Sequence, residues 1–338
     1  MTTPLPRRRL GTNGPEITTV GFGAWAIGGG GWAFGWGPQD DDASVAAIRH
    51  ALSRGVSWID TAAVYGYGHS EEVVARALAD IPRAERPLVF TKCGLRWNES
   101  DRMTPPVRDS SPRRIREECL DSLRRLRVET IDLYQFHWPD ESGTPLEESW
   151  GAMLKLVQEG KVRWAGVSNY DADRLQRCDG IGHVQSLQPP FSMIRRDAAA
   201  REIPWCAGHG TGVIVYSPMQ SGLLTDSFTA ERARSLAKDD WRRRSPEYQS
   251  PRLERNLQLR DALRPVAEKH GVAVAAVAVA WALCWPITAA IVGARSPEQV
   301  DGWIAAAGVR LDASDVNTIE AAIARTGAGG GPTRPPLG

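Results

Sequence analysis

The feature that most constrains the fold of this chain is a series of eight short apolar runs that alternate with helical patterns. The runs lack the apolar–polar alternation of half-exposed strands, which is typical of strands buried on both faces of a parallel sheet. They cover residues 17–23, 56–60, 88–92, 131–136, 164–168, 183–188, 212–217 and 287–294. Eight strand–helix units predict a closed (β/α)8 TIM barrel that forms one domain over residues 1–325.

The two ends of the chain differ from this repeat. RRRLG at 7–11, the Asn13-Gly14 pair and EITTV at 16–20 have the pattern of a β-hairpin with an Asn-Gly turn. A hairpin in front of the first barrel strand is in the right place to close the bottom of the barrel. The last residues, 326–338, are rich in glycine and proline and predict a flexible C-terminal tail.

Charge and hydropathy argue against several classes of partner. The chain has 41 Lys and Arg against 40 Asp and Glu, a net charge of +1, which gives no support for nucleic-acid binding. The triple arginines at 7–9 and 242–244 are predicted to be solvated surface clusters. The apolar stretch at 272–285 is too short to span a bilayer, which needs ~20 residues, so we expect a buried helix and no membrane partner.

Cysteine and histidine usage argues against disulfides and against a metal site. The five cysteines are scattered without a CxxC pair, which is typical of reduced thiols in a cytoplasmic protein. Cys206 and His209 form the only close Cys–His pair, and no second pair exists to complete a metal site. We therefore expect no bound metal.

Four polar residues follow the predicted strands at the points where the strands end. Asp60 ends the second run, Lys92 ends the third, His137 follows the fourth, and Tyr65 lies in the turn five residues after Asp60. Polar side chains at the C-terminal ends of different parallel strands form the active site of a barrel enzyme. A phenol beside an ammonium and an imidazole is an activated acid, and a carboxylate keeps the ammonium charged and in place.

Each of these residues alone has an ordinary structural interpretation. Asp60 would be a turn or cap residue, and Lys92 a solvated lysine. Tyr65 would be an exposed loop aromatic, and His137 a structural histidine. The joint pattern reverses that interpretation, because each residue comes at or soon after its own strand.

Three long connections follow strand ends and would surround the four polar residues: 24–37, 94–110 and the stretch after Tyr216. Aromatic residues in the first two either line a substrate pocket or anchor the loops, and both interpretations stay open. They are Trp25, Trp32, Phe34, Trp36 and Trp97. The G-x-G-x-x-A pattern from Gly21 matches a dinucleotide fingerprint, but four glycines at 28–31 oppose the helix that this fingerprint requires.

Three segments around the four polar residues resemble the aldo-keto reductase superfamily, which includes the potassium-channel β-subunits. They are DTAAVYGYGHSE at 60–71, TKCG at 91–94 and FHWPD at 136–140. The similarity is greatest to bacterial members related to general stress proteins and glyceraldehyde reductases, and it spans nearly the whole chain. The resemblance implies a (β/α)8 barrel, in agreement with the strand count.

The resemblance also implies a role for each of the four residues. Tyr65 would be the general acid that protonates the substrate carbonyl oxygen as hydride arrives at carbon. Lys92 would favour the phenolate needed in the reverse direction, and Asp60 would pair with Lys92. His137 would orient the carbonyl and share the proton relay.

Further matching segments imply a nicotinamide cofactor. The implied cofactor-binding residues are Ser168, Asn169, Gln188, Tyr216, Ser217, Pro218, Met219, Gly222, Leu223, Gly293, Arg295 and Gln299. Arg295 suits a phosphate dianion, so NADPH (NADP+) is favoured over NADH. Trp303 departs from the family pattern, which has an asparagine near the adenine at this point.

Taken together, the resemblance implies NADPH-dependent, reversible reduction of an aldehyde or ketone to an alcohol, with a small carbonyl compound as substrate. The alternative is a nicotinamide-binding regulatory subunit like the channel-associated relatives, whose output is a protein contact. Because those relatives also resemble the chain at the four polar positions, the motif discriminates weakly. The absence of a visible membrane segment or long disordered N-terminal arm favours the enzyme.

Overall fold

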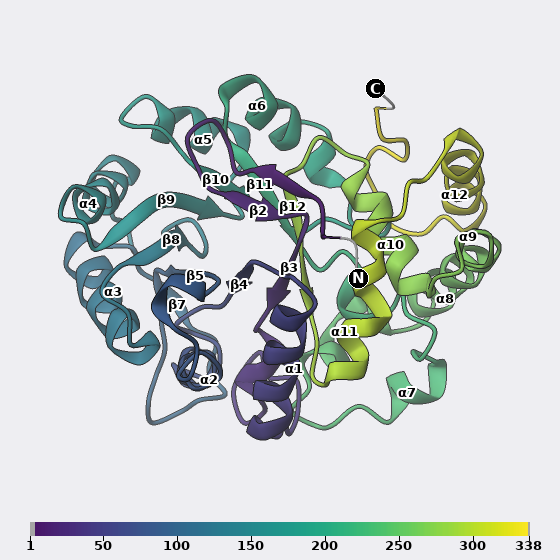
Figure 1. The fold of residues 1–338 in the computed structure, drawn as a ribbon, viewed down its shortest axis with the longest axis horizontal. Coiled ribbons are helices and arrows are strands. Elements are labelled where there is room, and N and C mark those ends of the chain that lie inside the picture. The colour runs from purple at the N-terminus through teal and green to yellow at the C-terminus, as the bar shows by residue number, and fades with distance from the viewer. Residues whose placement is uncertain (1–3, 337–338) are drawn as a thin grey trace.

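A computed structural model gives the fold of this chain and describes residues 4–336 (Figure 1). Eight parallel strands close into a barrel in the order β10-β11-β12-β3-β4-β5-β8-β9. The barrel strands are β3 (Val20–Gly23), β4 (Trp58–Asp60), β5 (Leu88–Cys93), β8 (Ile131–Phe136), β9 (Val162–Ser168), β10 (Ser186–Gln188), β11 (Gly212–Tyr216) and β12 (Ala289–Gly293). The prediction of a (β/α)8 barrel is confirmed.

Each predicted apolar run overlaps one barrel strand, and the first run also includes part of a second strand. Residues 17–23 divide into the end of β2 (Glu16–Thr18) and the barrel strand β3. β2 pairs antiparallel with β1 (Arg7–Arg9), so the predicted N-terminal hairpin forms. Leu10 and Ile17 are fully buried against the lower barrel interior, where the hairpin closes the barrel.

Helices surround the barrel and cover its outer face (Figure 1). Most follow a barrel strand directly, and α7 to α9 lie in the long connection between β11 and α10. They are α1 (Asp41–Ser53), α2 (His69–Ala77), α3 (Pro112–Leu126), α4 (Leu146–Gln158), α5 (Ala172–Asp179), α6 (Glu202–His209), α7 (Ala230–Arg234), α8 (Arg252–Ala262), α9 (Arg264–His270), α10 (Val274–Leu283), α11 (Pro297–Ile304) and α12 (Ala313–Thr326). α3 begins with Pro112 in its first turn, as predicted, because the missing proline N–H would have no helical partner there.

α10 is the buried helix that the apolar stretch at 272–285 predicts. All its residues are buried, so the helix needs no polar face. Within residues 4–336, no single helix is long and apolar enough to cross a membrane. The pair formed by residues 252–270 and 274–283 reaches the required length only across an 89° bend.

Residues 327–334, which lie in the segment predicted to be a flexible tail, contact the rest of the chain in the structure. Arg196 donates from its guanidinium to the carbonyl oxygens of Ala328 and Gly331, at 3.2 and 3.1 Å. Its backbone N–H donates to Gly330, and Arg334 pairs with Glu320 on α12. Composition missed these contacts because the partners come from a distant part of the chain; residues 337–338 lie outside the described range.

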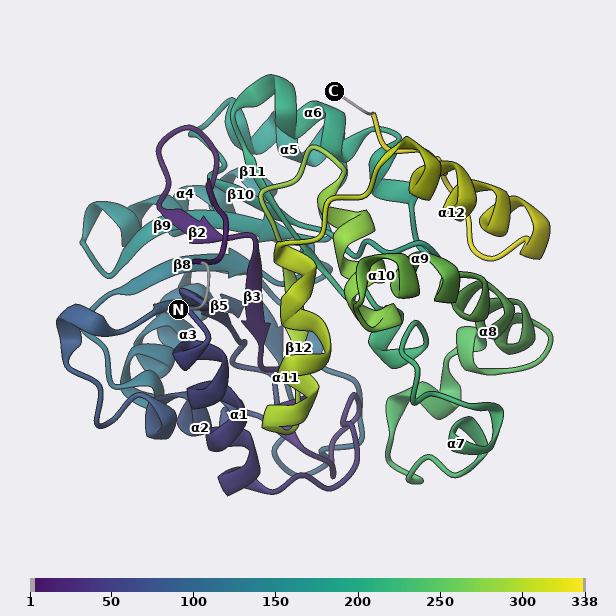
Figure 2. The ribbon, with the colours of Figure 1, turned by 45° about the vertical axis from the view of Figure 1, so that its right-hand side comes forward.

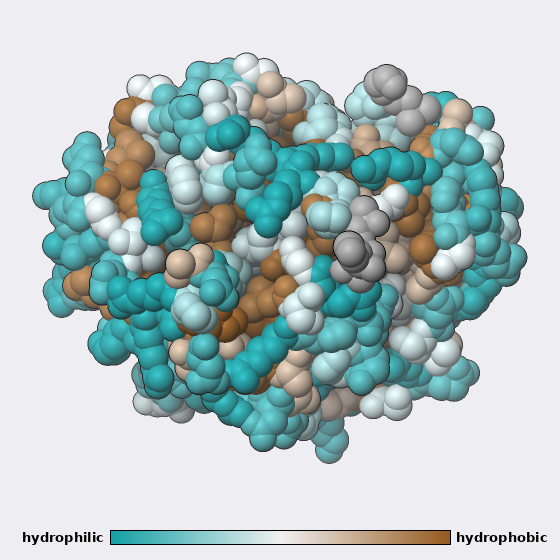
Figure 3. Space-filling model, viewed as in Figure 1, coloured by the Kyte–Doolittle hydropathy of each residue, from teal (hydrophilic) through white to brown (hydrophobic). Residues whose placement is uncertain are grey.

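The surface shows how the hydrophobic residues are distributed. Hydrophilic residues cover much of the face on which the N-terminal hairpin lies, with hydrophobic residues between them (Figure 3).

In the view turned by 45°, α7, α8 and α9 lie together on one side of the barrel, and α12 lies above α8 (Figure 2). α12 packs against α8.

Candidate active site

The structure brings the four predicted polar residues together at the C-terminal ends of the strands. The Lys92 ammonium donates to Asp60 Oδ1 at 2.5 Å and to the Thr61 carbonyl oxygen at 2.9 Å, and its side chain is fully buried. Lys92 Nζ lies 5.3 Å from the centroid of the Tyr65 ring. The Tyr65 and His137 rings meet edge to face, with centroids 5.5 Å apart. The convergence predicted from the strand ends is therefore present.

Burial decides the protonation of the two groups that face the substrate. Desolvation raises the pKa of Tyr65 well above its usual value, and the negative charge of Asp60 adds to the shift. Desolvation, followed by the Lys92 charge, holds the pKa of His137 well below its usual value. At neutral pH the site therefore presents a protonated phenol and an uncharged imidazole.

The Asp60–Lys92 pair is the charged centre below the phenol. Burial raises the pKa of Asp60, and the attraction and hydrogen bond of Lys92 oppose that rise. Burial also lowers the pKa of Lys92, against the opposing effect of Asp60. Burial dominates the phenol, so the pKa of Tyr65 stays above its usual value although the Lys92 ammonium lies 5.3 Å from its ring centroid.

A cavity of about 890 Å³ opens above these residues. Its walls include all the predicted site residues except Lys92 and Leu223. Lys92 lies beneath the cavity in the barrel interior, and Leu223 is fully buried in the hydrophobic core. Leu223 therefore supports the loop from inside instead of facing a ligand.

Four of the predicted cofactor-binding residues form one connected network. Tyr216 donates from its hydroxyl to Asn169 Oδ1 at 2.9 Å, and Asn169 Nδ2 donates to the His137 carbonyl oxygen at 2.9 Å. Ser168 Oγ donates to the Gln188 carbonyl oxygen at 2.7 Å. Gln188 Nε2 donates to Asp60 Oδ2 at 2.8 Å. The network ties the ends of β9, β10 and β11 to two of the four polar residues.

The loop after β11 has an unusual backbone where it lines the cavity. Ser217, Gln220 and Ser221 all have positive φ angles, between 47° and 57°. Side chains rarely adopt this conformation, and such backbone is often found at functional sites. Tyr248 holds the loop in place because its hydroxyl donates to the Gln220 carbonyl oxygen at 2.8 Å.

Arg295 lines the cavity, and it is also bonded to the loop that follows β3. Its guanidinium donates to Gln39 Oε1, to the Pro38 carbonyl oxygen and, at 3.5 Å, to the Trp36 carbonyl oxygen. Its backbone N–H donates to Gln299 Oε1 at 2.8 Å. Three of the five N–H groups of a guanidinium are thus directed to the protein, which leaves two for a ligand.

Two further arginines line the same part of the cavity, and sequence reasoning missed both. Arg242 was predicted to be solvated but is only 6% exposed; it pairs with Asp240 at 2.6 Å and lies 4.5 Å from the Trp36 ring centroid. Arg232 is exposed. Burial lowers the pKa of Arg295 most, and the positive charges of Arg242 and Arg232 lower it further. An arginine run followed by serine and proline gives no local signal of burial.

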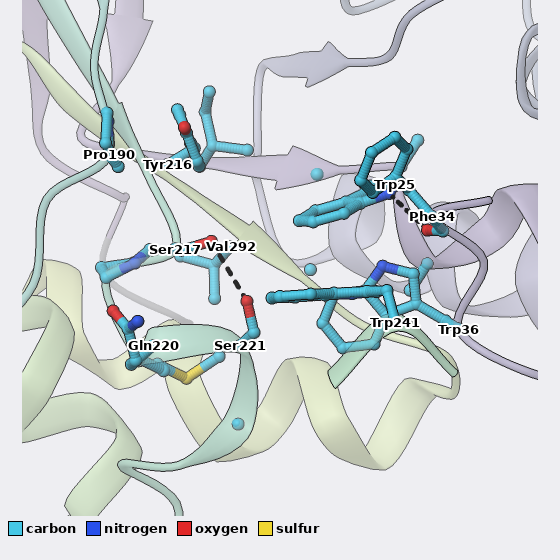
Figure 4. Close-up of a pocket in the computed structure, with 18 of the residues that line it drawn as sticks. Trp25, Phe34, Trp36, Pro190, Tyr216, Ser217, Gln220, Ser221, Trp241 and Val292 are labelled. Atoms are coloured by element: carbon cyan, nitrogen blue, oxygen red, sulfur yellow. Dashed lines mark hydrogen bonds between the residues drawn. The ribbon is translucent and has the colours of Figure 1, made fainter. Parts of the chain in front are cut away.

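Aromatic side chains form one wall of the cavity, which resolves the two interpretations left open above. Trp25 stacks between Tyr65 and Trp241, with ring centroids 6.2 and 5.1 Å away, and Figure 4 shows the Trp25 and Trp241 rings near Trp36. The Trp25 indole N–H also donates to the Phe34 carbonyl oxygen at 3.1 Å. These residues therefore both line the pocket and hold their loops, as do Trp32, Phe34 and Trp36.

Two further tryptophans have different surroundings. Trp97 does not line the cavity; it stacks on Tyr67 at 5.1 Å. Trp303 borders the cavity with 1% exposure and packs mainly in the core. Within residues 4–336, no three His, Cys, Asp or Glu side chains lie close enough to hold a metal ion.

Comparison with known proteins relates this geometry to a family. Residues 19–324 match the Aldo/keto reductase family. Aldo-keto reductase YhdN of Bacillus subtilis (strain 168) is 34% identical over 315 residues, 92% of each chain. NADH-specific methylglyoxal reductase of Escherichia coli (strain K12) is 33% identical over 321 residues, 92% of this chain and 96% of the relative.

A solved structure agrees with the sequence relatives. The glycerol dehydrogenase AKR11B4 from Gluconobacter oxydans superposes with a TM-score of 0.84 at 40% identity, over 96% of this chain and 97% of that one. The barrel, the converged polar residues and these matches lead to one conclusion. This chain belongs to the aldo/keto reductase family and is an oxidoreductase.

Proposed function

We propose that this aldo-keto reductase reduces an aldehyde or ketone to an alcohol, reversibly, with NADPH as hydride donor and Tyr65 as proton donor. The observation that carries the proposal is the protonated Tyr65 phenol on the cavity wall beside an uncharged His137 and above the buried Asp60–Lys92 pair. A neutral phenol is the form that can give a proton to a carbonyl oxygen. A neutral imidazole can orient that oxygen without repelling a cationic nicotinamide product.

The chain's own residues divide the work of the reaction. Tyr65 moves its hydroxyl proton to the substrate oxygen, and His137 holds that oxygen by a hydrogen bond. Asp60 keeps Lys92 in place below the ring. The aromatic wall around Trp25 excludes water from the reacting atoms. A bound nicotinamide would supply the hydride chemistry, which the protein only orients.

The cavity suits a dinucleotide by charge. Arg232, Arg242 and Arg295 line it, and Arg242 alone of the three has a carboxylate partner, Asp240, among residues 4–336. These three guanidinium groups favour phosphate groups. The network around Asn169 and Gln188 would hold the nicotinamide end, and the loop 217–222 would lie along the pyrophosphate.

NADPH over NADH is the finer part of the proposal. Arg295 keeps two N–H groups free for a 2′-phosphate, and Arg232 has no hydrogen bond from its guanidinium within the described range. One relative is NADH-specific by name, so membership of the family does not decide the preference.

The five cysteines form no disulfide in the described residues, which supports a cytoplasmic location.

The test is turnover with both cofactors and a panel of simple aldehydes, measured by loss of nicotinamide absorbance. The wild-type protein should oxidise NADPH faster than NADH at equal concentrations, and only when an aldehyde or ketone is present. A regulatory subunit would bind the cofactor in titration but show no turnover with any carbonyl compound. That result would overturn the proposed function.

A further inference from the structure

The main chain of His137 fixes where its imidazole lies. Among residues 4–336, neither ring nitrogen of His137 has a hydrogen-bond partner, but its backbone has two. The backbone N–H donates to the Cys93 carbonyl oxygen at 2.9 Å, and the backbone carbonyl oxygen accepts from Asn169 Nδ2 at 2.9 Å. The place of the imidazole therefore depends on these two anchors and on its packing against Tyr65.

The first anchor belongs to the peptide group that joins Cys93 to Gly94. The carbonyl of this group accepts from the His137 N–H, and its N–H donates to Glu118 Oε2 at 2.8 Å. Because a peptide group is planar, a bond that fixes the direction of its N–H also fixes the direction of its carbonyl. Glu118 thus acts on the main chain of His137 through one rigid unit.

The chain leaves the barrel at this peptide group. Cys93 is the last paired residue of β5, so the acceptor for the Gly94 N–H comes from α3 outside the barrel and not from a neighbouring strand. Gly94 has a φ angle of +87°, which glycine adopts readily and other residues rarely. A hydrogen bond from α3 therefore holds the backbone where strand pairing has ended.

Glu118 occupies a position on α3 where an apolar side chain would be expected. It is 2% exposed, and a buried carboxylate is costly unless it is hydrogen-bonded. Both oxygens are bonded, since Oε2 accepts from Gly94 and Oε1 accepts from Arg114 Nε at 2.8 Å. The inward-facing residues of the helix are Ile115, Glu118, Cys119, Ser122 and Leu126.

The Glu118 carboxyl offers an acceptor to Gly94 in either protonation state. Burial raises the pKa of Glu118 to about 7, and the charge of Arg114 opposes the rise. A protonated carboxyl keeps an acceptor oxygen, so the bond to the Gly94 N–H does not require the negative charge. Glutamine, which also has an acceptor oxygen, is therefore the conservative replacement.

A second buried carboxylate, Glu71 on α2, provides a contrast. It is fully buried and accepts from the Thr91 hydroxyl at 2.6 Å and from Arg125 Nε at 2.6 Å. Glu71 thus holds a side chain of β5, whereas Glu118 holds the peptide group that is bonded to His137.

We propose that Glu118 is a positioning residue of this reductase, which acts through the Cys93–Gly94 peptide group to place His137 for the substrate carbonyl. Glu118 does not line the cavity and touches no reacting atom. The inference rests on the proposed function, in which His137 holds the carbonyl oxygen.

The experiment compares Glu118→Leu and Glu118→Gln with wild type and with Glu117→Leu. Leucine has no acceptor for the Gly94 N–H, whereas glutamine keeps one. Glu117 is the matched control, because it is the preceding residue of α3, is exposed and pairs with Arg113 at 2.8 Å. For aldehyde reduction kcat and KM are measured separately, and cofactor affinity is measured by titration.

In Glu118→Leu, kcat should fall about tenfold, the upper end of the net contribution of one hydrogen bond, with cofactor affinity unchanged. Glu118→Gln and Glu117→Leu should match wild type. A wild-type kcat in Glu118→Leu would overturn the proposal. Equal losses in Glu118→Leu and Glu118→Gln would also overturn it, because the charge and not the acceptor would then matter. If wild type itself shows no turnover, the proposed function fails instead.

A second measurement does not depend on turnover. The NMR signals of the His137 ring protons are compared in the cofactor-free proteins, and their loss in His137→Gln identifies them. The Tyr65 ring lies 5.5 Å away, so its ring current makes these signals sensitive to the position of the imidazole. The signals should move in Glu118→Leu and stay at wild-type positions in Glu118→Gln and Glu117→Leu. Unmoved signals in Glu118→Leu would contradict the positioning role.

A third variant covers the case in which Glu118→Leu does not fold. Glu118→Asp keeps the carboxylate but withdraws it from the Gly94 N–H by one methylene group. It should show the same loss of kcat and the same movement of the His137 signals. A wild-type kcat with unmoved signals in Glu118→Asp would overturn the proposal.

Discussion

Lys92→Met tests the central ion pair most directly. The substitution removes a fully buried ammonium and leaves Asp60 with Gln188 as its hydrogen-bonded partner. Breaking a buried pair in this way costs about 3–5 kcal/mol, because the remaining charge stays desolvated. We expect that loss of stability in full at pH 8.

The pH dependence follows from the remaining carboxyl. Burial already raises the pKa of Asp60, and Lys92 is the largest effect that opposes the rise. In Lys92→Met the native pKa rises further, so the native state binds a proton that the unfolded state has released. The stability lost relative to wild type should therefore grow as pH rises above about 4, the unfolded pKa of an aspartate.

The assay is thermal unfolding followed by circular dichroism at pH 5, 6.5 and 8. Lys155→Met on α4 is the control, since Lys155 is exposed, and should change the midpoint little at any pH. Asp60→Asn/Lys92→Met should recover much of the loss, because no uncompensated charge remains. A loss in Lys92→Met that is independent of pH, or no recovery in the double variant, would refute the reasoning. Alcohol oxidation by Lys92→Met should shift to higher pH, because the ammonium no longer favours the phenolate.

Three further predictions follow from the site. Tyr65→Phe keeps the ring but removes the proton donor, so carbonyl reduction should fall by at least ~100-fold with cofactor titration unchanged; near-normal turnover would remove Tyr65 from that role. Arg295→Ala should weaken NADPH binding by roughly 1.5–3 kcal/mol, the range for a hydrogen bond to a charged group, and should change NADH binding little. Calorimetry with both cofactors checks this, and equal losses for NADPH and NADH would mean that Arg295 mainly anchors residues 36–39. Gly166→Ala should lower the unfolding midpoint because its Cβ would meet Ser186 Oγ at 2.1 Å, and Ser186→Ala in the same chain should restore part of it; an unchanged midpoint in Gly166→Ala would contradict the tight packing.

Much of the fold was predictable because its signals are local. A buried parallel strand is a short apolar run, and an amphipathic helix repeats its apolar residues every three or four positions. Asp60, Tyr65, Lys92 and His137 could be grouped for the same reason: in a parallel barrel, all strand C-termini meet on one face. Position along the chain was therefore enough to bring these four residues together.

The tertiary structure decided what depends on partners distant in sequence. Arg242 is buried because Asp240 and the Trp36 ring compensate its charge, and residues 327–334 contact Arg196 and Glu320. Leu223 was assigned to the ligand side of its loop, yet it faces the core.

Protonation was also beyond the sequence, since it depends on burial. The same phenol and imidazole would titrate near their ordinary pKa values on an open surface. Here the closed barrel and the aromatic wall remove water, which keeps Tyr65 protonated and His137 neutral. The sequence alone determined which side chains meet at the barrel mouth, and the three-dimensional packing decided their charge, because desolvation is a property of the whole enclosure and of no single segment.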